Sequence, residues 1–206
     1  LLLAAASARD EDPKFFVSNT LTVIRNCISD KRGLLETLSA ADVEWLLLQI
    51  RAKSVSEKID IKYTDENGDG KEEIISLDIE KFYIDVPEDH EYKINLTDDI
   101  GVVMRDLRFA ERIGYLSKFK DLPKTDVIYE TIVDCVESIF DADQVYKVGE
   151  NTSKEEVRVF IEQLTGVSSK LYNFVATMPQ IAVDFVTEAG NKITLTGRDI
   201  DFLTLS

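Results

Sequence analysis

The chain has 206 residues, of which 44% are hydrophobic and 31% are charged, a balance typical of globular proteins with a sizeable core. Its formal net charge of -15 would repel a phosphate backbone, so the composition argues against direct nucleic-acid binding. The sequence has no apolar run near the ~18 residues that a membrane span needs, which argues against a membrane-spanning protein.

The first predicted helix covers residues 14–28. Asp12 is suited to cap this helix and Pro13 to occupy its first turn. The preceding LLLAAASA lacks the basic region of a signal peptide, so we expect the numbering to begin inside a helix whose upstream residues are missing. Apolar residues recur at helical spacing in the first helix, and they are Phe15, Phe16, Val17, Leu21, Val23, Ile24, Cys27 and Ile28.

A second and more hydrophobic helix is predicted from about residue 40 to Lys53. Ser39 and Asp42 have the spacing of a capping box at its start. Because it is the most hydrophobic helix, we expect it to lie centrally, with Trp45 in the core, as most helix aromatics are. Its apolar face would consist of Val43, Leu46, Leu47 and Ile50, widened by Trp45 and Leu48.

Residues 58–105 change to an alternating pattern that is typical of strands. KIDIKY and EEIISLDI alternate on either side of DENGDG, which predicts a β-hairpin. KFYIDV and EYKINL are further short strands by the same criterion. We therefore expect residues 58–105 to form one small antiparallel sheet.

Residues 106–178 return to helical periodicity. VIYETIVDCVESIF and SKEEVRVFIEQL are predicted helices, the second capped by Thr152 or Ser153, and VSSKLYNFVATM would end before Pro179. Residues 179–206 contain a hairpin signature around Ala189-Gly190-Asn191 and a short apolar tail. The prediction is a single α+β domain over residues 1–206, with helical segments packed around a small antiparallel sheet and a C-terminal β-hairpin.

The DENGDG loop has the beginning of a calcium-binding EF-hand loop, with Asp65, Asn67 and Asp69 at the first three ligand positions. The rest of the template fails, since Glu72 stands at an apolar position and Ser76 replaces the bidentate glutamate. The flanks also alternate with period two, whereas an EF-hand loop is flanked by helices. These features favour an acidic hairpin turn over a weak calcium site, and no metal site is predicted.

The sequence contains no recognisable catalytic or cofactor-binding motif. Glycine-rich phosphate loops, G-x-S-x-G and H-E-x-x-H are absent, so no catalytic residue and no cofactor are predicted. His90, the single histidine, lies in the polar run PEDHEYK and is expected to be exposed. Cys27 and Cys135 lie in apolar runs and are expected to be buried free thiols.

Candidate interface residues come from the string IRAKSVSE at residues 50–57. Arg51 and Lys53 can be explained as basic residues at a helix C-terminus, or as a basic spot that faces a partner carboxylate. Arg105 is a further basic candidate, and Trp45 is an interface candidate if it is not in the core.

Around this string the chain resembles a phage protein family. DVEWLLLQIRAKSVSE is similar to the D-x-E-x-L-F-L-x-L-R-A-K-S-V-G-E signature of the baseplate hub assembly proteins of T-even-like contractile-tailed phages. LLLAAASARDEDP with VIRNCI, then INLTDDIGVVMRDLRF, FVATMP and LTGRDIDF resemble further segments of that family in the same order. Ser56 replaces the usual glycine, and Arg105-Asp106-Leu107 stands where a Lys-Tyr-Pro-like string is common.

The resemblance implies non-catalytic work in tail assembly. The protein would help to build the baseplate hub in the host cytoplasm, in a chaperone-like manner, by binding hub or tape-measure proteins. A permanent structural subunit of the virion baseplate is the alternative, and a calcium-responsive binding module is a more distant one. The family also has an N-terminal arm, which this chain is expected to lack.

Overall fold

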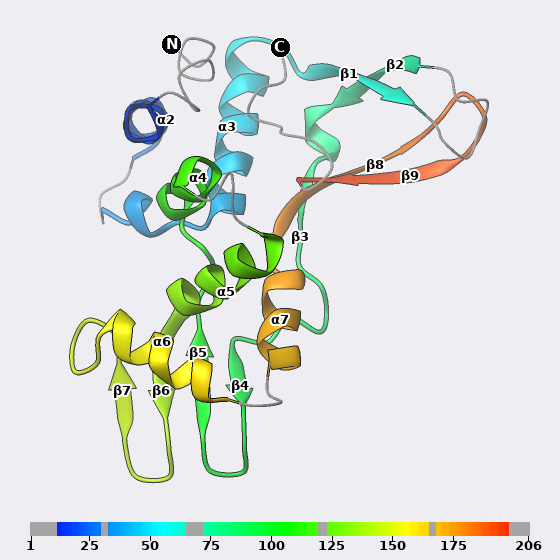
Figure 1. Ribbon diagram of the computed structural model, residues 1–206. Helices are drawn as coiled ribbons and strands as arrows, with labels where there is room; N and C mark the ends of the chain where they lie inside the picture. The colour runs from blue at the N-terminus through cyan, green and yellow to red at the C-terminus, as the bar shows by residue number, and fades with distance from the viewer. Residues whose placement is uncertain (1–11, 30–32, 65–71, 119–122, 165–167, 198–206) are drawn as a thin grey trace. The chain divides into compact units, whose positions relative to one another are not determined.

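The computed structural model describes residues 12–29, 33–64, 72–118, 123–164 and 168–197 (Figure 1). Its helices and small antiparallel sheets, with a C-terminal strand hairpin, confirm the predicted α+β class. The chain divides into two compact units. Unit 1 consists of Leu1–Asp85, Arg108–Ser117 and Gln180–Ser206, and unit 2 consists of Val86–Leu107 and Lys118–Pro179.

The helices at the start of unit 1 begin where the sequence predicts. Helix α2 covers Pro13–Cys27, and the Asp12 carboxylate accepts a hydrogen bond from the backbone N–H of Phe15 at 3.0 Å. Helix α3 covers Ala40–Ser54, and Ser39 and Asp42 form the capping box. A short 3-10 turn, η1 (Leu35–Thr37), lies between them, and α4 (Phe109–Lys118) contributes its residues up to Ser117 to the same unit.

The strands of unit 1 form two separate sheets. Strands β1 (Lys58–Thr64) and β2 (Glu72–Asp78) pair antiparallel, as the hairpin prediction requires. A second sheet has the order β3-β8-β9, built from β3 (Tyr83–Asp85), β8 (Gln180–Val186) and β9 (Lys192–Thr196). Gly190 adopts a φ of 87° between β8 and β9, a left-handed conformation that favours glycine, and the C-terminal hairpin is confirmed.

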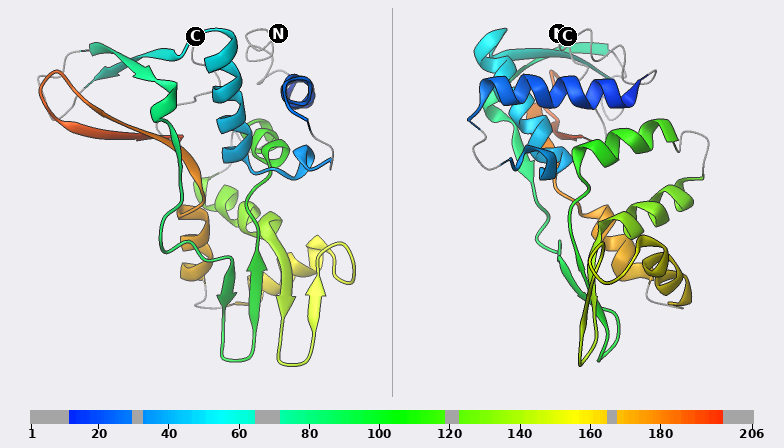
Figure 2. Two further views of the ribbon diagram at one scale, coloured as in Figure 1. Left: turned by 180° about the vertical axis from the view of Figure 1, so that it is seen from behind. Right: turned by 90° about the vertical axis from the view of Figure 1, so that its left-hand side faces the viewer.

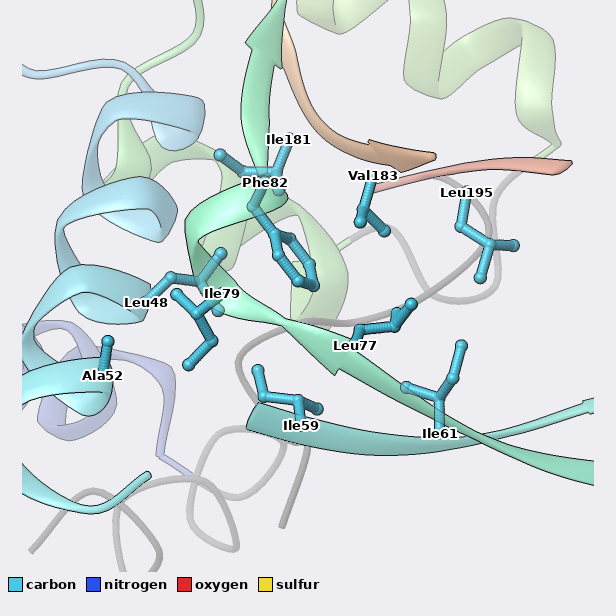
Figure 3. Close-up of a cluster of buried hydrophobic side chains, with 10 residues drawn as sticks. All are labelled: Leu48, Ala52, Ile59, Ile61, Leu77, Ile79, Phe82, Ile181, Val183 and Leu195. Atoms are coloured by element: carbon cyan, nitrogen blue, oxygen red, sulfur yellow. The ribbon is translucent and has the colours of Figure 1, made fainter. Parts of the chain in front are cut away.

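Helix α3 packs against two hydrophobic clusters of unit 1, which confirms its predicted central position. Val43 and Leu47 face a cluster that includes residues of α2 and α4. Leu48 and Ala52 face a cluster shared with the strands and the 3-10 turn η2 (Ile79–Lys81). Figure 3 shows that second cluster, whose members are Leu48, Ala52, Ile59, Ile61, Leu77, Ile79, Phe82, Ile181, Val183 and Leu195.

Unit 2 is a four-stranded antiparallel sheet with helices on one face, as the right-hand view of Figure 2 shows. The sheet order is β4-β5-β6-β7, from β4 (Lys93–Asn95), β5 (Gly101–Met104), β6 (Val136–Phe140) and β7 (Val145–Lys147). Its helices are α5 (Lys124–Cys135), α6 (Lys154–Gln163) and α7 (Ser168–Ala176). Ser153, one of the two predicted caps, caps α6 and forms a capping box with Glu156.

The prediction of one sheet over residues 58–105 is wrong. Strands β1 and β2 pair only with each other, β3 pairs with β8, and β4 and β5 belong to the sheet of unit 2. Paired strands can lie far apart in the sequence, as Ile84 and Ile181, which lie opposite each other, show. Strand alternation reports only that a strand has one buried face, so it does not identify the partner.

The predicted helix VIYETIVDCVESIF is also wrong in its second half. Helix α5 ends at Cys135, and the next residue, Val136, begins β6 without an intervening loop. Val136, Ile139 and Phe140 in that half are β-branched or aromatic and suit a strand beside β5. Residues 106–178 therefore contain two strands, β6 and β7, in addition to helices.

Candidate functional site

The three interface candidates on α3 do not share one face of the helix. Trp45 is 36% exposed, so its expected burial in the core is wrong, while Lys53 is exposed and Arg51 is half-buried. Successive residues turn by about 100° around an α-helix, which places Lys53 about 80° from Trp45 and Arg51 about 120° away on the other side. Gln49 lies between Trp45 and Lys53, so these three residues form a strip along α3, which we call the α3 strip.

Arg105, the fourth candidate, belongs to unit 2 and is half-buried beyond the end of β5. Its backbone N–H donates to the Cys135 carbonyl at 2.8 Å, and its guanidinium donates to the Asp106 carbonyl at 3.0 Å. These contacts fasten the end of β5 to the junction of α5 and β6. Its position gives Arg105 a structural role whether or not it contacts a partner.

The acidic loop with Asp65, Asn67 and Asp69 lies outside the described residues. Its flanks are the antiparallel strands β1 and β2, which confirms the period-two pattern on both sides of the loop. The preference for a turn over a calcium site stays a prediction, which calorimetric titration with calcium would test. Among the residues that the structure describes, no three His, Cys, Asp or Glu side chains gather into a metal site.

Two sequence expectations about single residues fail. Cys135 is buried as predicted, but Cys27 at the end of α2 is exposed. The His90 side chain was expected to be exposed and is completely buried. Its ring stacks on Phe174 with centroids 4.7 Å apart, and Tyr92 meets it edge-on at the same distance.

Hydrogen bonding fixes the orientation of the His90 ring. The Thr177 hydroxyl donates to the Asn173 carbonyl at 2.8 Å and lies within hydrogen-bond distance of Nδ1 of His90, at 3.0 Å. On the other side, Nε2 faces Oδ1 of Asp106 at 3.5 Å. These contacts and the aromatic stack attach the segment before β4 to α7, an arrangement that packs unit 2 and does not present a reactive group. In the sequence around His90, the aromatic Tyr92 two residues away was the only signal that this histidine would be buried.

Beside this cluster, β4 and α7 enclose a cleft of about 490 Å³ within unit 2. Buried Ile94 and Phe174 are its apolar lining residues. Charged and uncharged polar residues line the rest, and Lys170 donates from Nζ to the Asn95 carbonyl at 2.6 Å. The full lining is Asp89, Glu91, Lys93, Ile94, Asn95, Ser169, Lys170, Asn173 and Phe174.

Unit 1 has a hollow of about 570 Å³ along α2, lined mainly by residues of α2 and α4. Val17, Leu21, Ala110 and Gly114 supply its apolar surface, and Arg25 pairs with Glu36 within its lining. Ala110 and Gly114 of α4 are small residues, so they leave the hollow along α2 open. Nothing in the sequence pattern predicted it, because the hollow depends on how α2 and α4 pack.

A charged cluster joins α5 to α6 in unit 2. Arg158 of α6 pairs with Glu130 of α5 through its two terminal guanidinium nitrogens, and these hydrogen bonds raise the pKa of Arg158. The Tyr129 hydroxyl donates to the Arg158 carbonyl at 3.0 Å. Burial, together with the Glu162 carboxylate, raises the pKa of Tyr129 to about 12. The cluster holds two helices together and faces none of the clefts described above.

No helix among the described residues is long and apolar enough to cross a membrane. No curated protein and no solved structure matches the chain. Residues 1–197 match the family described as "T4 bacteriophage base plate protein". This match covers nearly the whole sequence and confirms the resemblance at the level of the family, so the chain belongs to the T4-type phage baseplate protein family.

Proposed function

We propose that the protein is a non-catalytic assembly factor of the phage baseplate hub, which binds hub or tape-measure components in a chaperone-like manner. The observation that carries the proposal is the family match over residues 1–197. A net charge of -15 supports the proposal, because copies of a strongly acidic protein repel one another and so resist self-association while the protein binds a partner. Under this proposal the protein acts in the host cytoplasm while the tail is assembled.

The α3 strip is the partner surface that we propose in unit 1. Trp45 presents a large apolar side chain, and Lys53 presents a positive charge on an acidic protein. Tryptophan is enriched among the residues that dominate binding energy at interfaces, and a basic residue at the rim favours an acidic partner surface. Arg51 lies on another side of α3, so it would contribute little to the same contact.

Co-expression with the hub and tape-measure proteins of the same phage tests the proposal. We expect one of them to co-purify with the wild-type chain, and Trp45→Ala to weaken that binding by at least tenfold, as for an interface hot spot. Tyr172→Ala is the matched control, since Tyr172 is 37% exposed and lies on a helix of unit 2. If neither protein co-purifies with the wild type, the proposal is wrong.

A permanent structural subunit is the second candidate, because the family description names a base plate protein without assigning a transient role. Mass spectrometry of purified virions separates the two. An assembly factor should be absent or substoichiometric, whereas a structural subunit should be present in a fixed ratio to other baseplate proteins.

A further inference from the structure

The two edges of the unit 2 sheet differ in how their backbone groups are satisfied. At the β7 edge, the loop that follows the strand takes the place of a further strand. The Lys147 N–H donates to Oδ1 of Asn151 at 2.6 Å, and Nδ2 of Asn151 donates to the Val145 carbonyl at 3.3 Å. The Thr152 N–H donates to the Lys147 carbonyl at 3.2 Å. The outward N–H of Lys147 and the outward carbonyls of Val145 and Lys147 therefore have partners within the chain.

The β4 edge has no such loop. The Met104 N–H donates to the Tyr92 carbonyl, and the Leu96 N–H donates to the Ile100 carbonyl. With Ile94 opposite Val102, the antiparallel alternation turns residues 92, 94 and 96 toward β5. The same alternation turns the N–H and C=O groups of Lys93 and Asn95 away from the sheet.

Among the described residues, these four outward groups of β4 find one partner, Nζ of Lys170 on the Asn95 carbonyl at 2.6 Å. Lysine beside an edge strand commonly serves to discourage unwanted pairing. Here it satisfies one carbonyl and leaves both N–H groups directed outward, next to the cleft of about 490 Å³. An extended polypeptide backbone has the donors and acceptors that this edge lacks.

We propose that β4 pairs with an extended peptide segment of a partner protein, which adds a fifth strand to the sheet and places side chains in the cleft between β4 and α7. Alternate side chains of an added strand enter the neighbouring pockets. Ile94 and Phe174 suit an apolar side chain, Asp89 and Glu91 suit a basic one, and Lys170 suits an acidic one. The source of the peptide, a hub or tape-measure protein, rests on the proposed function.

Replacing Lys93 tests backbone pairing separately from side-chain contacts. Lys93→Pro removes an outward N–H that β5 does not use, and proline is tolerated at such positions of edge strands. Lys93→Ala removes the side chain and keeps the N–H, so it is the matched control. Asn95→Pro and Asn95→Ala repeat the comparison two residues along the strand, in case Lys93→Pro fails to fold.

The probe is a displayed library of random 12-residue peptides selected on the full chain, followed by fluorescence anisotropy with the synthesised peptides. We expect the selected peptides to bind Lys93→Pro about tenfold more weakly than wild type, as the loss of one hydrogen bond implies, and to bind Lys93→Ala almost as well as wild type. If the library yields no binding peptide, or if its peptides bind Lys93→Pro as tightly as wild type, the inference is overturned.

The inference and the proposed function fail in different experiments. Failure of the hub and tape-measure proteins to co-purify would overturn the proposed function, while selected peptides that lose affinity for Lys93→Pro would still support strand addition. Conversely, a hub protein that co-purifies equally with wild type and Lys93→Pro would overturn strand addition by that protein and leave the assembly function standing.

Discussion

Gly101→Ala should destabilise unit 2 because β5 leaves no room for a Cβ atom at this position. Gly101 lies opposite Asn95 of β4 and Phe140 of β6. A Cβ built on Gly101 would stand 2.7 Å from the Ile94 carbonyl oxygen and 2.8 Å from Cε2 of Phe140, with Cζ of that ring still closer. Real Cβ atoms essentially never approach other atoms within 3.0 Å, so the structure must shift.

The two obstacles differ in how easily they move. The Phe140 ring belongs to a half-buried side chain and can rotate away, whereas the Ile94 carbonyl belongs to the backbone of β4. Forcing one extra carbon into a well-packed region costs about 1–3 kcal/mol. We expect about 2 kcal/mol for Gly101→Ala, since the backbone of a short edge strand gives way in part.

Urea unfolding followed by far-UV circular dichroism measures this loss, and hydrogen exchange of residues 93–104 assigns it to β4 and β5. Phe140→Ala combined with Gly101→Ala should recover only the part of the cost that comes from the ring. The reasoning is refuted if Gly101→Ala leaves the urea midpoint unchanged. It is also refuted if removing the Phe140 ring abolishes the whole cost, because the backbone contact would then be irrelevant.

Three further predictions concern the stability of each unit. Arg112→Ala should cost about 2 kcal/mol in urea unfolding, because Glu44, whose side chain is 7% exposed, loses the charged hydrogen bond from the Arg112 guanidinium at 2.9 Å, and Glu44→Gln in the same chain should recover part of that loss. Ser39→Ala should cost about 1 kcal/mol by removing the cap of α3, read by the fluorescence of Trp45, the single tryptophan. The pKa of Tyr129, about 12 when folded and about 10 when unfolded, makes the protonated form the stabilised one, so its contribution is complete below about pH 10 and is lost toward pH 12. The difference in unfolding free energy between wild type and Tyr129→Phe should therefore shrink over this range; a constant difference would contradict the assignment.

Local signals in the sequence predicted the parts of the fold that local chemistry determines. Asp12, Ser39 and Ser153 cap their helices because a capping side chain needs only the backbone N–H groups two or three residues ahead. The hairpin of β8 and β9 follows in the same way from a glycine that adopts a positive φ. These features are complete within a few residues, so a single sequence reveals them.

Features that depend on distant residues escaped prediction. His90 is buried because Phe174 and Thr177 of the α7 region close over it, more than eighty residues away, while its own neighbours in sequence are charged. The boundary between α5 and β6 depends on the neighbouring strand β5, which offers Val136 and its successors a partner. The cleft at β4 has the same origin, because it requires α7 beside the edge strand.

On helix α3, the exposed residue tells more about function than the buried residues do. Buried positions surround most of this helix, since Val43 and Leu47 face one hydrophobic cluster and Leu48 and Ala52 face another. Packing of unit 1 therefore explains the hydrophobic character of α3 without Trp45, which is 36% exposed on the remaining strip. Under the proposed function, the exposed part of Trp45 contacts a partner. Trp45→Ala should consequently weaken partner binding as well as lower the unfolding free energy, and unchanged partner binding would make Trp45 a purely structural residue.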